Sequence, residues 1–269
     1  MEGCQLARNV NGGGQSGKLY LVGIGPGDSD LLTPGAVAVL AESDAIVGFR
    51  AYVDQVAGLV TGKELVSMEL GQELERAAKA VDLAYAGKTV AVVSSGDAGI
   101  YGMAGPVFRV LTDRGWDGQT PAVETVPGVS ALQSAAALLG SPLMQDFCAI
   151  SLSNLLTPWE AIEKRLTAAA QGDFVCALYN PRSQRRDWQL LEARKIMLEY
   201  RSGQTPVGVV GDAFRLGQRT VVTDLDGLEE HCPNIDMVTI VLIGNSTTYV
   251  HSGHMVTPRG YEEKVIPTG

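Results

Sequence analysis

Short apolar runs alternate along the chain with longer amphipathic segments, and this alternation predicts an α/β fold. In the first half of the chain, the apolar runs predict strands over residues 19–22, 45–47, 65–66, 89–93 and 122–126. Helical patterns follow, the first of them with Thr33 as N-cap and Pro34 at the first helical position. Two others cover residues 74–86 and 104–114, and residues 127–131 open an alanine-rich helix that runs to Leu139. Strands that alternate with helices at this spacing predict a mostly parallel sheet.

The second half follows a different pattern after Gly140-Ser141-Pro142, which breaks the preceding helix. Apolar runs predict strands over residues 147–152, 174–178, 206–210, 219–222 and 238–243, without long helices between all of them. This arrangement predicts a mixed sheet with some antiparallel pairing. A capping box with Pro at the first position, residues 157–160, predicts one helix start. We therefore expect an N-terminal α/β domain over 18–140, a C-terminal α/β domain over 146–262, and a disordered polar tail over 1–17.

Three predicted strands of the first half run into loops of small residues. These loops are Gly23-Ile24-Gly25-Pro26-Gly27-Asp28, the stretch 94–103, and Pro127-Gly128-Val129-Ser130-Ala131. In open α/β sheets, small ligands bind outside such strand ends. The first loop is a poor dinucleotide site, because Asp28 replaces the third glycine of the fingerprint and Pro26 lacks a backbone donor. A P-loop over 12–19 is excluded, because Leu19 stands where a magnesium-binding hydroxyl is required.

Composition narrows the function classes further. The formal net charge of −9 argues against a non-specific nucleic-acid binder. The four cysteines show no C-x-x-C spacing, so we expect no metal bound by the protein. Cys148 and Cys176 lie in apolar runs, and we interpret them as small buried hydrophobic residues in a reducing compartment. No apolar run approaches 18 residues, and we expect a cytoplasmic protein without membrane partners.

Taken together, the three small-residue loops resemble the signature loops of the tetrapyrrole methylases. Within that superfamily, residues 151–159, Tyr179-Asn180-Pro181-Arg182-Ser183 and Gly244-Asn245-Ser246-Thr247-Thr248 resemble the precorrin-3B C17-methyltransferase branch. The resemblance implies a homodimeric C-methyltransferase of cobalamin biosynthesis that uses S-adenosylmethionine, held in a cleft between two α/β domains. It implies methylation of C17 and ring contraction, which convert precorrin-3B or its cobalt-bearing counterpart into precorrin-4 or cobalt-precorrin-4.

The resemblance also implies a cofactor site. Its residues would be Pro26, Ser95, Gly96, Asp97, Ile100, Ser130, Ala131, Asn180 and Ala213. Three of them have structural alternatives: Asp97 as a cap of the following helix, Ser130 as an early-helix hydroxyl, and Asn180 as the start of a turn before Pro181.

The proposed substrate is a flat polycarboxylate, so its binding site is expected to contain side chains that pair with carboxylates. Arg50, Ser153 and Asn154 follow predicted strands and are the expected substrate-binding residues. The cluster Arg182, Arg185 and Arg186 is either a solvated or dimer-facing surface or a substrate contact. His251 and His254 lie in a Ser/Gly-rich stretch typical of a surface turn.

Ring contraction requires a base to deprotonate a macrocycle hydroxyl. Uroporphyrinogen-methylating relatives carry a carboxylate after the second strand that has been regarded as a base. This chain has Phe49 at that position, so the same base cannot be assigned here. Asp28 is the catalytic candidate, with a turn residue that bonds its own backbone as the alternative. Two other functions stay open: a precorrin methyltransferase acting on another ring carbon, and a non-catalytic tetrapyrrole-binding protein.

Overall fold

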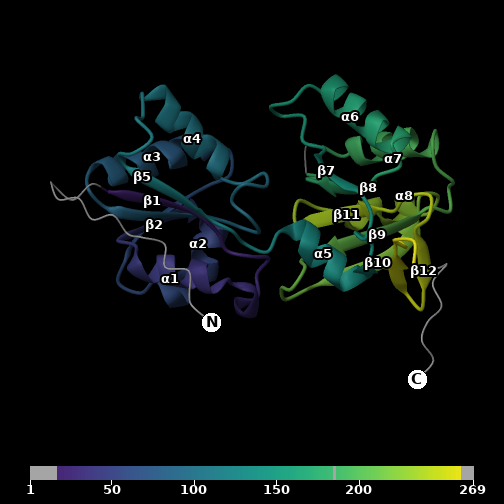
Figure 1. The fold of residues 1–269 in the computed structure, drawn as a ribbon, viewed down its shortest axis with the longest axis horizontal. Helices are drawn as coiled ribbons and strands as arrows, with labels where there is room; N and C mark the ends of the chain where they lie inside the picture. The colour runs from purple at the N-terminus through teal and green to yellow at the C-terminus, as the bar shows by residue number, and fades with distance from the viewer. Residues whose placement is uncertain (1–16, 184–185, 262–269) are drawn as a thin grey trace. The chain divides into compact units, whose positions relative to one another are not determined.

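The computed structural model describes residues 17–183 and 186–261. The tail predicted to be disordered and Arg185 lie outside the described residues, apart from Gly17. Contacts between residues divide the chain into two units, Met1–Gly25 with Leu32–Gly128, and Pro26–Leu31 with Val129–Gly269. Each unit is built around a five-stranded sheet (Figure 1).

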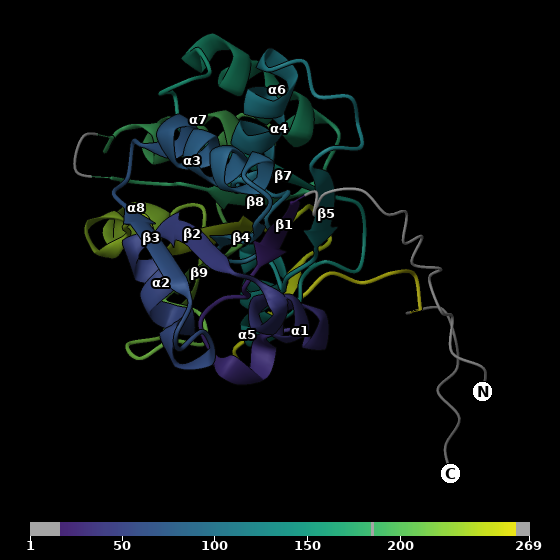
Figure 2. The ribbon, with the colours of Figure 1, turned by 90° about the vertical axis from the view of Figure 1, so that its left-hand side faces the viewer.

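The first unit has an entirely parallel sheet of order β3-β2-β4-β1-β5. Its strands are β1 (Lys18–Gly23), β2 (Ala45–Phe49), β3 (Glu64–Met68), β4 (Thr89–Ser94) and β5 (Ala122–Val126). One face packs against α1 (Pro34–Glu42) and α2 (Arg50–Val56), and the other against α3 (Glu73–Tyr85) and α4 (Ala104–Asp113) (Figure 2). The central strands β1 and β4 are covered on both faces, which explains their continuous apolar runs.

The second unit has a mixed sheet of order β10-β9-β11-β8-β7. Its strands are β7 (Phe147–Ser151), β8 (Val175–Tyr179), β9 (Pro206–Gly211), β10 (Arg219–Asp224) and β11 (Thr239–Ile243). β7 and β8 are parallel, whereas β11 is antiparallel to both β8 and β9. β7, β8 and β9 therefore end at the same edge of the sheet. The prediction of one mostly parallel and one mixed sheet is confirmed.

Helices cover both faces of this second sheet. The helix α5 (Ala131–Leu139) packs on one face, and α6 (Trp159–Gln171), α7 (Gln189–Leu198) and α8 (Leu228–His231) pack on the other (Figure 1). A small third sheet joins β6 (Gly140–Ser141), β12 (Tyr249–His251) and β13 (His254–Val256). Short 3-10 helices occur at Ser29–Leu31, Ala57–Leu59 and Cys232–Asn234.

Two local expectations change on comparison with the structure. The capping box predicted at residues 157–160 is wrong: α6 begins at Trp159, and Pro158 is its N-cap without a side-chain cap bond. The carbonyl of Pro158 accepts the first helical hydrogen bonds, from Ala161 and Ile162. The predicted domain break at 140–142 also differs from the contact division at Gly128–Val129, because the apolar face of α5 packs on the second sheet. The limits 18–140 and 146–262 remain a prediction.

Candidate functional site

In the first unit, the candidate site lies at the carboxyl edge of the parallel sheet. β1 leads into α1 on one face, whereas its neighbour β4 leads into α4 on the other. In open α/β sheets, ligands bind outside the carboxyl ends of such a strand pair, where the connections diverge to opposite faces. The loops that follow β1 and β4 are the small-residue loops singled out in the sequence.

Backbone contacts between glycines join these loops. Gly25 and Gly96 exchange two backbone hydrogen bonds, with N···O distances of 3.1 and 2.7 Å. A Cβ atom on Gly128 would lie 2.1 Å from the carbonyl oxygen of Gly96, so only glycine permits this approach. Gly96 itself has φ of 66°, which favours glycine. Gly25, Gly96 and Gly128 therefore hold parts of the three loops against one another at the sheet edge.

The Asp97 carboxylate links two of these loops. Its Oδ1 accepts from the Gly99 N–H at 2.8 Å, and its Oδ2 accepts from the Gly128 N–H at 3.0 Å. The capping alternative for Asp97 is wrong, because α4 begins at Ala104 with Met103 as N-cap and no side-chain cap bond. Instead the Met103 N–H donates to the Ser94 hydroxyl at 3.0 Å.

Other predicted residues of the first unit lie at the same edge. Ser95 is half-buried and Ile100 is 40% exposed in the loop after β4. Arg50 begins α2, directly after β2, and its Nε pairs with the Glu69 carboxylate at 2.9 Å on the exposed surface. A polycarboxylate that binds Arg50 would have to compete with Glu69.

Sequence reasoning missed Arg76, a buried cation beside the loop after β4. Its side chain is on α3, and Arg76 is only 3% exposed. Nη1 lies 3.3 Å from the Met103 sulfur and Nη2 donates to the Glu69 carbonyl at 2.7 Å, while Nε has no partner among the described residues. Burial lowers the pKa of this guanidinium. The signal in the sequence was an arginine on the stripe formed by Ala80 and Ala84, where an apolar residue is expected.

In the second unit, α5 begins at the carboxyl edge of the sheet. The Ser130 hydroxyl accepts from the Gln133 N–H at 3.3 Å, and the Gln133 side chain accepts from the Ser130 N–H at 3.0 Å, which is a capping box. The Tyr179 hydroxyl, at the end of β8, accepts from the Leu132 N–H at 3.0 Å. This bond places Ser130 and Ala131 near the end of β8.

The remaining predicted residues of this unit follow β7, β8 and β9 at that edge. The Asn180 amide donates to the Ser151 hydroxyl at 3.0 Å, and Asn180 has φ of 51°, so the chain turns there. The Ser153 N–H donates to the same hydroxyl at 3.2 Å. The side-chain oxygen of Asn154 accepts from the Gln189 side-chain amide at 3.0 Å. Ala213 lies two residues beyond β9 and is half-buried. The strand directions thus bring four residues from separate parts of the sequence to one edge.

Pro26–Leu31, the later part of the loop after β1, group with the second unit by their contacts. The Pro26 carbonyl accepts a hydrogen bond from Arg215 Nε. Asp28 is exposed, and its Oδ1 accepts from the Asp30 N–H at 3.0 Å, as the turn interpretation predicts. Its role as a base stays a prediction.

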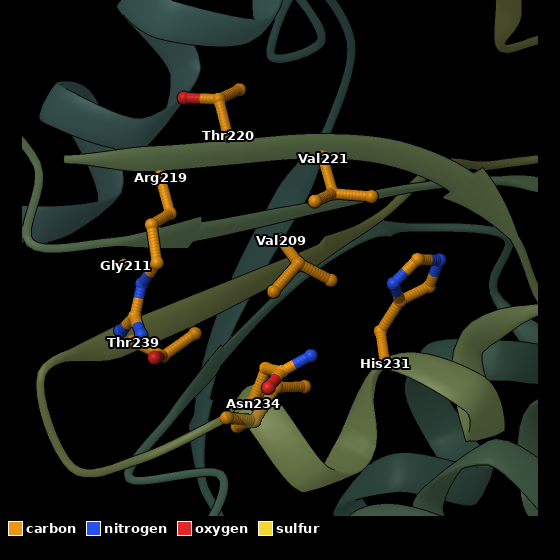
Figure 3. A pocket seen from close by; sticks show the side chains of 9 residues that line it. Val209, Gly211, Arg219, Thr220, Val221, His231, Asn234 and Thr239 are labelled. Atoms are coloured by element: carbon orange, nitrogen blue, oxygen red, sulfur yellow. The ribbon is translucent and has the colours of Figure 1, made fainter.

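A cavity of about 300 Å³ opens on the face of the second sheet that carries α8 (Figure 3). It is lined by Val209, Gly211, Arg219, Thr220, Val221, His231, Asn234, Ile235 and Thr239. The Arg219 guanidinium is paired with Asp236 at 3.2 Å and Asp212 at 3.5 Å, so its charge is already balanced. No predicted site residue lines this cavity.

The other predicted clusters have structural contacts of their own. The Arg182 guanidinium donates to the Cys232 carbonyl, and Arg186 pairs with Ser183 through the backbone. His251 and His254 are exposed and close the hairpin of β12 and β13, in agreement with the predicted surface turn. Among the residues that the structure describes, no group of three or more His, Cys, Asp and Glu side chains is placed to hold a metal ion, and no helix is long and apolar enough to cross a membrane.

Residues 18–229 match the family model described as Tetrapyrrole (Corrin/Porphyrin) Methylases. The chain belongs to this family. It is therefore a methyltransferase of the tetrapyrrole methylase type, and the resemblance that the sequence motifs predicted is confirmed.

Two relatives within the family are similar to the chain over most of its length. The chain is 50% identical over 249 residues to a protein of Priestia megaterium named cobalt-factor III methyltransferase, covering 92% of this chain but only 46% of that protein. It is 44% identical over 243 residues to a probable cobalt-factor III C(17)-methyltransferase of Salmonella typhimurium, covering 90% of this chain and 99% of that protein. The chain thus spans under half of the first relative and nearly all of the second.

Solved structures agree with the fold. The crystal structure of the methyltransferase CobJ matches with a TM-score of 0.85 and 38% identity, covering 90% of this chain and 100% of that chain. A uroporphyrin-III C-methyltransferase from Thermus thermophilus, complexed with S-adenosyl homocysteine, matches with a TM-score of 0.65 and 25% identity, covering 85% and 92%.

Proposed function

We propose that this tetrapyrrole methylase transfers a methyl group from S-adenosylmethionine to C17 of precorrin-3B or its cobalt-bearing counterpart, with ring contraction, in cobalamin biosynthesis. The match over nearly the full length of the Salmonella relative, which is named for C17, carries this proposal. The names of both relatives contain cobalt, so the proposed preference is for the cobalt-bearing substrate. Neither alternative, another ring carbon or a non-catalytic carrier, has support from these relatives.

The residues present fit the proposed cofactor. When bound, S-adenosylmethionine supplies an electrophilic methyl group, and its in-line transfer depends on proximity and orientation. The glycine contacts bring the backbone of the loops after β4 and β5 together, and the exposed Ile100 offers apolar surface. We propose that Pro26, Ser95, Gly96, Asp97, Ile100, Ser130, Ala131, Asn180 and Ala213 line the site.

The substrate would be held by side chains that follow the strands. Ser153 and Asn154 offer donors at the end of β7, and Arg50 offers a guanidinium at the end of β2. Carboxylates on the macrocycle would pair with these groups. For ring contraction we propose Asp28 as the base, because it is exposed in the loop after β1. Its Oδ1 bond to Asp30 holds the carboxylate in one orientation.

The deciding experiment incubates the pure protein and S-adenosylmethionine with the metal-free and the cobalt-bearing tetrapyrrole in parallel. We expect a mass gain of one methyl group, faster with the cobalt-bearing substrate, and a nuclear magnetic resonance signal for a methyl group on C17. Methylation at another carbon would replace the proposed regiochemistry, and absence of methylation on either substrate would exclude the proposed function.

We also propose a homodimer. Light scattering should report a mass about twice the 28.4 kDa of one chain. A mass of one chain at assay concentration would contradict the proposal.

A further inference from the structure

Two cysteines that are 28 positions apart in the sequence face each other across neighbouring strands. Cys148 on β7 and Cys176 on β8 are register partners in the parallel ladder, and their sulfur atoms lie 3.6 Å apart. Both side chains lie on the face of the sheet that packs against α6 and α7. Both thiols are free, with Cys176 buried and Cys148 partly exposed.

Their environment is electropositive. Arg201 is buried, and its Nη2 lies 4.0 Å from the Cys176 sulfur. The guanidinium is fixed by hydrogen bonds to the Gly244 and Phe174 carbonyls, both at 2.6 Å. The nearby Asp173 carboxylate is 4.0 Å from Arg201 Nε and is hydrogen-bonded to Ser246. A fixed cation next to a pair of thiols favours the thiolate form, which is the reactive form of cysteine.

We propose that Cys148 and Cys176 are a thiol-modification site, which low-molecular-weight disulfides such as oxidised glutathione convert into a disulfide between β7 and β8. Backbone spacing permits the bond. Neighbouring strands lie about 4.8 Å apart, within the range of Cα separations of roughly 4.4–6.8 Å that disulfides span. Because both sulfur atoms already lie on one face of the sheet, closure requires side-chain rotation that shortens their separation from 3.6 Å to the roughly 2.05 Å of an S–S bond.

The two thiols have different parts in the reaction. The hydrogen bond with Cys176, aided by Arg201, lowers the pKa of the Cys148 thiol against the effect of burial. The same hydrogen bond, together with burial, raises the pKa of the Cys176 thiol. Cys148 is therefore the attacking thiol, and it is the less buried residue of the two.

The reaction balances in two exchange steps. The Cys148 thiolate attacks one sulfur of oxidised glutathione, forms a mixed disulfide and releases one glutathione thiolate. Cys176 then loses its proton and attacks the Cys148 sulfur, which releases the second glutathione. The two protein thiols supply the two electrons that reduce the glutathione disulfide, and the protein becomes two hydrogen atoms lighter.

The test treats the full-length protein with glutathione buffers of increasing oxidised fraction, blocks free thiols with N-ethylmaleimide and digests without reductant. Lys164 and Arg165 separate the two cysteines, so trypsin puts them on different peptides unless a disulfide joins them. We expect the joined peptide to accumulate as the oxidised fraction rises, and to disappear with dithiothreitol. This measurement uses the unmodified sequence and does not depend on methyltransferase activity.

Variants separate the two roles. Cys176→Ser should stop the reaction at a glutathione adduct on Cys148, whereas Cys148→Ser should slow adduct formation at least tenfold. Cys232→Ser is the matched control, because Cys232 is another partly buried free thiol and its removal should leave the joined peptide unchanged. Absence of the joined peptide in fully oxidised buffer, or its replacement by a bond to Cys4 or Cys232, would overturn the proposal.

Discussion

The Asp97 side chain connects the loop after β4 to the loop after β5. It accepts one backbone hydrogen bond from Gly99 and one from Gly128, and both acceptors belong to a carboxylate. Hydrogen bonds to charged groups contribute about 1.5–3 kcal/mol each. The carboxylate therefore orders the backbone that is proposed to contact the cofactor.

We predict that Asp97→Ala weakens S-adenosylmethionine binding roughly tenfold or more, since each 1.4 kcal/mol is a factor of ten, while the protein stays folded. Calorimetric titration measures the affinity, and circular dichroism checks the fold. Asp117→Ala is the matched control, because Asp117 also accepts two backbone hydrogen bonds, from Gln119 and Thr120, in a loop outside the proposed site. Equal affinities for the Asp97 variant and the unsubstituted protein would remove Asp97 from the cofactor site.

Gly128 tests the close approach of the loops. A Cβ atom there would meet the Gly96 carbonyl at 2.1 Å, so Gly128→Ala should destabilise the protein by about 1–3 kcal/mol through overpacking and should weaken cofactor binding. Gly105→Ala is the control, because a Cβ atom on this residue of α4 meets nothing within 4 Å. Helix propensity predicts that the control gains about 0.5–1 kcal/mol. Urea denaturation measures both, and a tolerated Gly128→Ala would show that the contact of the loops relaxes easily.

At the residue scale, sequence reasoning located the loops but not their internal contacts. The glycines indicated close backbone approach, yet nothing local in the sequence shows that Gly25 bonds to Gly96, 71 positions later. The cysteine pair was missed for the same reason, because strand order decides which residues become neighbours. Arg76 was detectable from its position on an apolar helical stripe.

Among the elements, α5 combines a structural and a proposed functional role at its first turn. Ser130 caps the helix, so Ser130→Ala should cost about 1 kcal/mol from the lost cap. Because Ser130 is also proposed to contact the cofactor, Ser130→Ala should in addition weaken S-adenosylmethionine binding. Thr33→Ala is the comparison, because Thr33 caps α1 by accepting from the Ala36 N–H and is not among the proposed cofactor residues, although its hydroxyl also donates to the Pro127 carbonyl at 3.3 Å. If both variants lose stability but neither loses affinity in calorimetry, Ser130 acts only as a cap.

The elements that the sequence predicted best are those with long apolar patterns. The predicted strand 89–93 lies within β4, whose residues are almost all buried, and the N-cap of α1 is at Thr33 as predicted. The missed helix α2 has seven residues and buries only Val53 and Val56, too few to show a helical period. The third sheet was missed because its strands have two or three residues and pair at long range, as in Met255 with Gly140.

For the whole molecule, the class of each sheet was predictable but its strand order was not. Alternation of strands and helices indicates parallel pairing, whereas the central place of β1 between β4 and β5 depends on long-range packing. This order decides where connections diverge to opposite faces. It therefore also decides which of the small-residue loops can act together.

Binding of the proposed cofactor has a thermodynamic consequence for the whole molecule. A ligand that binds only the folded protein stabilises it by about 2.7 kcal/mol at a hundredfold excess over Kd. We predict that S-adenosyl homocysteine raises the midpoint of thermal unfolding in differential scanning calorimetry by roughly 5–10 °C, at about 2–4 °C per kcal/mol. Asp97→Ala should reduce this shift, whereas Asp117→Ala should leave it unchanged. An unchanged midpoint at saturating ligand would contradict the proposed cofactor site.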